Sequence, residues 1–209
     1  MLRVAVRGLT LLLCSLMLWI APVSAQPNPS SNSKGRSSAH VYLFTGLFGI
    51  TSGLDGVAAK IKNQGLPTTM SSPGASESIA QSAIDEYRSG RLRSIVLIGY
   101  STGGRSVLEM AAHLAAAKVP VQLAVIIDGS SGPPVAPNVR RLVNFYVFDG
   151  YGAPITRPTN FRGSLENIAV KDSKVGHFSI IDAKERQLLS LVLSAARSGP
   201  AASPPSPNP

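Results

Sequence analysis

Apolar and polar residues alternate along this chain in two distinct patterns. Short apolar runs predict β-strands, whereas segments with apolar residues three or four positions apart predict amphipathic helices. The predicted strands are residues 41–45, 67–71, 94–100, 121–128, 142–149 and 166–170, and the predicted helices are residues 54–64, 76–89, 105–118 and 183–197. Strands alternate with helices, and several strands are apolar on both faces. We therefore predict a compact α/β fold, with a mainly parallel sheet and helices on both faces.

The two ends of the chain lack this alternation. Residues 1–25 combine two early arginines with an apolar stretch and a small-residue cleavage pattern, which predicts a signal peptide. Residues 26–38 are rich in proline, serine and asparagine, and residues 199–209 are rich in proline, so we expect a disordered linker and a disordered tail. One folded domain, residues 39–198, remains between them.

Charge and cysteine content exclude several function classes. The chain has 20 basic and 11 acidic residues, and loss of Arg3 and Arg7 with the signal peptide lowers the net charge from +9 to +7. The basic residues are scattered and are not interleaved with aromatic residues, so we expect no nucleic-acid partner. The single cysteine, Cys14, lies in the signal peptide. The mature protein therefore lacks a disulfide, a thiol nucleophile and a zinc–thiolate site.

One stretch of the chain indicates a chemistry. Residues 95–104 read I-V-L-I-G-Y-S-T-G-G, an apolar strand that ends in G-x-S-x-G and leads into a helix. In this context a serine lies at a sharp strand-to-helix turn with its hydroxyl exposed, which marks Ser101 as a candidate nucleophile. Gly99 and Gly103 stand where a Cβ atom would collide with the neighbouring element. No Lys-Ser or Lys-Thr pair follows the glycines, so the stretch is not a phosphate-binding P-loop.

A serine nucleophile needs a histidine base and a carboxylate that orients the histidine. The chain has three histidines. His40 belongs to the amino end of the first strand, and His113 lies within a helix, whereas His177 follows the last strand in a glycine-containing loop and fits the base. The acid has two candidates, Asp128 and Asp149. Each ends a predicted strand and is followed by glycine, so each could also be a turn residue.

The oxyanion of an acyl-transfer intermediate needs two N–H donors. One is expected from the residue after the nucleophile, Thr102, and the other from the turn after the first strand. In that turn, residues 45–49, we expect the donor to be the N–H of Leu47.

These residues together resemble the α/β-hydrolase superfamily, and within it the thioesterase-like branch. Residues 98–132 resemble the thioesterase domains of acyl-chain synthases, residues 176–179 resemble the histidine loop of that branch, and residues 45–49 resemble its oxyanion turn. Thr45 stands where a histidine is more usual in that turn.

The resemblance also bears on the acid and on access to the site. It implies that Asp128 is the acid, because the acid of these domains commonly follows the strand after the nucleophile helix; the common alternative places it one strand later, at Asp149. Only about a dozen residues separate Asp128 from the next predicted strand, where many relatives insert a helical lid. We therefore expect a lidless, open site.

The sequence thus predicts an exported serine hydrolase, periplasmic or secreted, that cleaves a carboxylic ester or thioester through an acyl-enzyme. Ser101, Asp128 and His177 would form its triad, with no metal and no organic cofactor. The expected substrate is a small-molecule or lipid acyl ester or thioester, and the expected membrane contact is only through the signal peptide before cleavage. Two alternatives stay open: a non-catalytic hydrolase-fold binding protein of the cell envelope, and an acyltransferase that uses the same triad.

Overall fold

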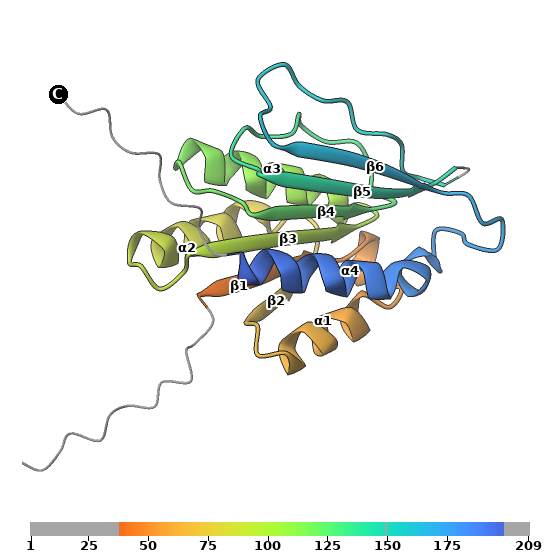
Figure 1. Ribbon diagram of the computed structural model, residues 1–209, viewed down its shortest axis with the longest axis horizontal. Coiled ribbons are helices and arrows are strands. Elements are labelled where there is room, and N and C mark those ends of the chain that lie inside the picture. The colour runs from red at the N-terminus through yellow and green to blue at the C-terminus, as the bar shows by residue number, and fades with distance from the viewer. Residues whose placement is uncertain (1–37, 149, 199–209) are drawn as a thin grey trace, which may run out of the picture. The chain divides into compact units, whose positions relative to one another are not determined.

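A computed structural model describes residues 38–148 and 150–198 of the chain. The expected signal peptide, most of the expected linker, the tail and Asp149 lie outside the described residues. The described residues form a six-stranded sheet in the order β2-β1-β3-β4-β5-β6, in which every neighbouring pair is parallel (Figure 1). The strands are β1 (Ala39–Phe44), β2 (Thr68–Ser71), β3 (Ser94–Tyr100), β4 (Leu123–Ile127), β5 (Arg141–Val147) and β6 (Ser164–Val170).

Helices cover both faces of this sheet (Figure 1). The helices are α1 (Leu54–Asn63), α2 (Ser76–Arg88), α3 (Gly103–Ala116) and α4 (Ile180–Arg197), and a short 3-10 turn, η1 (Leu47–Gly49), precedes α1. One apolar layer packs α2 and α3 against the sheet, and a second layer packs α1 and α4 against its other face. The predicted α/β fold with a parallel sheet is therefore confirmed.

The strand side chains divide between the two layers because successive residues of a strand point to opposite faces. In β1, Val41 and Leu43 pack on the side of α1 and α4, whereas Tyr42 and Phe44 pack on the side of α2 and α3. Every residue of β3 is buried. Burial of apolar surface on both faces, worth roughly 25 cal/mol per Å², is the main term that holds the central strands in place.

Most of the observed elements begin or end one to three residues away from the predicted bounds, and two of these differences have a clear physical cause. Helix α4 begins at Ile180, three residues before the predicted start, because Ile180 and Ile181 are fully buried and belong to its apolar face. Strand β6 begins at Ser164 rather than at residue 166, since it pairs with β5 from Arg141 onward. β6 lies at the edge of the sheet, and most of its residues are exposed or half-buried. Several of them are polar, so the apolar pattern that predicts a buried strand is weak there.

All six strands end at one edge of the sheet, because they are parallel. The loops that follow β1, β3, β4, β5 and β6 therefore meet at this carboxyl edge (Figure 1). The described residues between β4 and β5 contain no helix, and neither do the described residues between β5 and β6. No helix in the described ranges has both the length and the apolar character needed to cross a bilayer.

Two glycines of the G-x-S-x-G motif bring α3 into direct contact with the sheet. A Cβ atom on Gly99 would lie 2.2 Å from the carbonyl oxygen of Gly103. A Cβ atom on Gly103 would lie 2.3 Å from the carbonyl oxygen of Phe44, at the end of β1. Real Cβ atoms do not come this close to backbone atoms, so both positions require glycine for the observed packing.

We expect Gly99→Ala to destabilise the protein by more than about 3 kcal/mol, because the backbone of α3 must shift to relieve the collision. Gly56→Ala is the matched control: Gly56 lies in α1, and no atom lies within 4 Å of a Cβ placed there. That variant should gain about 0.5–1 kcal/mol, since alanine favours helix over glycine. Urea unfolding of both variants checks the prediction, and equal stability of Gly99→Ala and the wild type would contradict it.

Candidate active site

Ser101 occupies a sharp turn between β3 and α3. Its φ angle is 55°, a left-handed conformation that non-glycine residues rarely adopt. The N–H of Ser101 donates to the carbonyl oxygen of Ile127 at 3.0 Å. Its own carbonyl oxygen accepts from the N–H groups of Gly104 at 3.0 Å and Ser130 at 3.1 Å. The strained conformation is thus held by neighbouring backbone on both sides of the serine.

The carboxylate of Asp128 is buried at the end of β4 with no exposed surface. Its Oδ1 atom accepts hydrogen bonds from the N–H groups of Val147 at 3.0 Å and Gly152 at 2.9 Å. Its Oδ2 atom accepts from the N–H of Tyr151 at 3.2 Å and lies 2.6 Å from Nδ1 of His177. Four donors therefore surround one carboxylate, which meets the hydrogen-bonding needs of a buried charge.

These contacts decide the protonation state of Asp128. Burial by itself raises the pKa of the carboxyl group, because the charged form loses its hydration. The hydrogen bonds from Val147, His177, Gly152 and Tyr151 act in the opposite direction and together hold the pKa of Asp128 below its ordinary value. Asp128 is therefore ionised at neutral pH.

Two glycines of the β5–β6 loop allow the loop to wrap around this carboxylate. A Cβ atom on Gly150 would lie 2.6 Å from Oδ2 of Asp128, and one on Gly152 would lie 2.7 Å from Oδ1. The glycines leave room for the backbone to approach the carboxylate closely. No sequence pattern marks these two glycines, because a close approach of the backbone has no side-chain signature.

His177 lies between the carboxylate and the serine. Its side chain is 11% exposed, and its Nε2 atom lies 3.2 Å from Oγ of Ser101. An ionised carboxylate can only accept, so in the neutral ring Nδ1 carries the proton and donates to Asp128. Nε2 is then the acceptor, and the Ser101 hydroxyl donates to it. The structure thus brings Ser101, Asp128 and His177 together in one hydrogen-bonded series.

Aromatic rings and one hydroxyl hold the histidine loop in place. The ring centroid of His177 lies 4.8 Å from that of Tyr100, 4.5 Å from that of Tyr151 and 5.2 Å from that of Phe178. The Tyr100 hydroxyl donates to the carbonyl oxygen of His177 at 3.1 Å and accepts from the Ser52 hydroxyl at 3.0 Å. Burial raises the pKa of Tyr100, so this hydroxyl keeps its proton and remains a donor. Tyr100 occupies the variable position of the motif before the serine, and sequence reasoning missed its role.

The two expected oxyanion donors flank Ser101. Leu47 begins η1, and a Cβ on the preceding residue, Gly46, would lie 3.3 Å from Cβ of Ser101. In the turns and loops of residues 38–148 and 150–198, the N–H groups of Leu47 and Thr102 donate to no backbone carbonyl. Leu47, Thr102, Ser101 and His177 all line one pocket of about 230 Å³, which we call the reaction pocket.

The remaining candidates lie apart from this pocket or outside the described residues. His40, at the amino end of β1, contacts the Thr69 hydroxyl at 2.8 Å and stacks on Tyr42, and burial lowers its pKa despite the nearby Glu86. His113 is exposed on α3. Asp149, the alternative acid, is not among the described residues. No three His, Cys, Asp or Glu side chains of the described part are grouped so that they could hold a metal ion.

Comparison with known proteins gives similarity in structure but not in sequence. No protein-family model matches the chain, and no curated protein matches it. The solved structures that are similar to it include three with a TM-score of 0.53. The type II thioesterase BorB from the borrelidin biosynthetic cluster is 11% identical, with 76% of this chain and 93% of BorB covered. Human thioesterase 2 is 8% identical, and the match covers 81% of this chain and 100% of human thioesterase 2.

The third structure is the RedJ thioesterase from the prodiginine biosynthetic pathway in Streptomyces coelicolor. It is 14% identical, and the match covers 84% of this chain and 91% of RedJ. Identities this low establish the architecture alone. The parallel sheet, the layers of helices and these three structural matches together show that the chain has the α/β-hydrolase fold.

Proposed function

We propose that the protein is an exported serine hydrolase that cleaves a carboxylic ester or thioester through an acyl-enzyme. One observation carries the proposal: Asp128, His177 and Ser101 are joined by hydrogen bonds at the strained turn that exposes the serine. This arrangement has the parts that nucleophilic acyl transfer requires, namely a nucleophile, a base within reach and a carboxylate that orients the base.

In the first half of the reaction, Oγ of Ser101 attacks the carbonyl carbon of the substrate. The serine proton passes to Nε2 of His177, and the carbonyl oxygen becomes an oxyanion. The N–H groups of Leu47 and Thr102 donate to this oxyanion, and each such donor typically lowers the barrier by about 3 kcal/mol. The imidazolium that forms is stabilised by the ionised carboxylate of Asp128, which keeps its charge throughout.

The remaining steps release the two products and return the enzyme to its starting state. Nε2–H of the imidazolium protonates the leaving alcohol or thiol as its bond to the acyl carbon breaks, which leaves the acyl group on Ser101. His177 then removes a proton from water, and the water oxygen attacks the acyl carbon. Collapse of the second oxyanion returns the proton to Ser101 and releases the carboxylic acid.

The surroundings of the reaction pocket support an apolar substrate. The loops at the carboxyl edge expose six large hydrophobic side chains, which are Leu47, Phe48, Ile50, Phe148, Tyr151 and Phe178. Apart from His177, no titratable side chain other than tyrosine lines the reaction pocket among the described residues. The three structural neighbours are named thioesterases. Because carrier-bound acyl thioesters are scarce outside the cytoplasm, we favour an acyl ester or lipid substrate for an exported enzyme.

A fluorophosphonate probe tests the nucleophile, since such probes react covalently with activated serines. We expect the purified protein to be labelled at Ser101, and Ser101→Ala to lose both the label and at least about 10⁴-fold in kcat on a p-nitrophenyl ester. Folded wild-type protein that stays unlabelled would contradict the proposal and favour a binding protein. Product analysis with added alcohols separates the remaining alternative, because an acyltransferase forms a new ester instead of the acid.

The proposed role of Asp128 requires an ionised carboxylate, which gives a pH prediction. A carboxyl group whose pKa is lower in the folded protein stabilises the fold above its unfolded pKa of about 4, and this stabilisation is lost as the pH falls through the folded pKa. The stability difference between wild type and Asp128→Asn should therefore be constant near neutral pH and shrink below about pH 4. Urea unfolding at a series of pH values measures it, and a difference that does not change with pH would contradict the pKa direction.

Export also has a direct test. Expression of the full chain in a bacterium should yield a periplasmic or secreted protein whose first residue is Gln26, because residues 23–25 read V-S-A. Replacement of Ala25 by a bulky residue should block this cleavage. Mass spectrometry of the intact protein from each cell fraction measures the result, and an uncleaved chain in the cytoplasm would contradict the prediction.

A further inference from the structure

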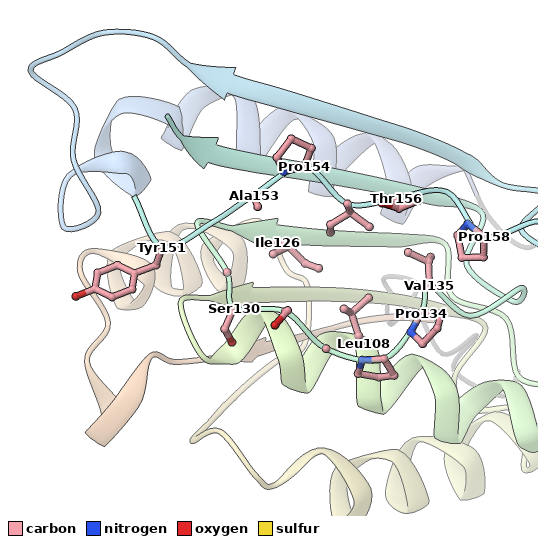
Figure 2. Close-up of a pocket in the computed structure, with 15 residues that line it drawn as sticks. Leu108, Ile126, Ser130, Pro134, Val135, Tyr151, Ala153, Pro154, Thr156 and Pro158 are labelled. Carbon is pink, nitrogen blue, oxygen red and sulfur yellow. The ribbon is translucent and has the colours of Figure 1, made fainter. Parts of the chain in front are cut away.

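A second pocket, of about 580 Å³, adjoins the reaction pocket and shares two of its lining residues, Ser130 and Tyr151. Figure 2 shows its walls: the loop after β4 on one side and the segment 151–158 on the other, with Leu108 of α3 and Ile126 of β4 between them. The reaction steps proposed above assign no role to this pocket.

The lining of the second pocket selects against charged ligands. Leu108, Ile126, Val135 and Ile155 contribute aliphatic surface, and four prolines contribute rigid apolar rings. Its polar side chains are hydroxyl groups, and no charged residue is among the described residues that line it. Such a surface binds hydrocarbon, because a charged group would lose its hydration there without a partner.

The position of the pocket relative to the reacting groups indicates which part of a substrate it holds. The N–H of Ser130, in its wall, donates to the carbonyl oxygen of Ser101 at 3.1 Å, so the pocket adjoins the nucleophile. His177 does not line it. Besides the reaction pocket, His177 lines a third pocket of about 570 Å³, whose walls include the charged residues Lys171 and Asp172. The histidine must protonate the leaving group, so the leaving group belongs on the side of His177.

We propose that the second pocket binds the acyl chain of the substrate, and that the leaving group faces the polar third pocket. The assignment rests on the proposed function and adds to it the substrate class: esters of acids with an uncharged hydrocarbon chain of several methylenes. Each buried methylene should raise kcat/KM about fourfold until the pocket is full.

Two tryptophan substitutions test the assignment by filling the pocket at different depths. Ala153 and Thr156 are exposed, line the same wall, and follow one another along it away from Tyr151 (Figure 2). Ala153→Trp should stop the rise in kcat/KM at a short acyl chain, and Thr156→Trp should stop it at a longer one. Ala59→Trp, on the exposed side of α1, is the matched control and should keep the wild-type profile.

The measurement uses two series of esters. In the first, p-nitrophenyl esters carry acyl chains from acetyl to decanoyl; in the second, acetates carry alcohols of rising length. We expect the ratio of decanoate to acetate kcat/KM to fall at least tenfold in Ala153→Trp, while the ratios within the alcohol series stay as in the wild type. Folded tryptophan variants with the wild-type acyl profile, or with an altered alcohol series instead, would overturn the assignment alone. A wild-type protein that hydrolyses none of the esters would overturn the proposed function as well.

Discussion

The hydrogen bonds of the buried Asp128 carboxylate hold the loops of the candidate active site in place. Asp128 directly follows β4, and its carboxylate accepts three N–H groups from the end of β5 and the loop that follows. The same carboxylate contacts the ring of His177, which precedes α4. Two segments that are distant from Asp128 in sequence, residues 147–152 and the loop of His177, are thereby fixed to one charged group. Loss of the carboxylate would leave several buried donors without an acceptor, at about 1–3 kcal/mol for each. The group that orients the proposed base therefore also holds together the loops that shape the pockets.

This arrangement requires two strained backbone conformations, and the packing of the sheet stabilises them. Ser101 and Asp128 both have positive φ angles, at the ends of adjacent strands β3 and β4. The two turns are joined, since the N–H of Ser101 donates to Ile127 and the N–H of Ser130 donates to Ser101. Strained residues persist where the surrounding structure determines their conformation, and here fully buried strands and two obligatory glycines do so. The fold thus presents the hydroxyl and the carboxylate on adjacent strand ends before any substrate binds.

The sequence predicted the strands, the helices and the type of sheet, because periodicity of apolar residues is a local signal. It also marked Ser101, His177 and two possible acids as candidates, since motif, chain order and strand ends are visible in the residues, and the structure brings Ser101, His177 and Asp128 together. It could not choose between Asp128 and Asp149 without a resemblance, because both end apolar strands and precede a glycine. The donors around Asp128 are backbone groups from a loop with irregular conformation, and the support from Tyr100 and Ser52 spans 48 residues. Such contacts depend on the folded geometry and leave no periodic pattern. The second pocket was missed for the same reason, as its walls come from two loops on either side of β5.

The tautomer of His177 is the sharpest test of the proposed hydrogen-bonded series from Asp128 to Ser101. Nitrogen-15 NMR of histidine-labelled protein distinguishes the two neutral tautomers, and single substitutions of His40 and His113 assign the signals. We expect neutral His177 to carry its proton on Nδ1, facing Asp128, in the wild type and in Ser101→Ala, and to lose this preference in Asp128→Asn. A wild-type ring with the proton on Nε2 would contradict it, because that nitrogen could not accept the serine proton.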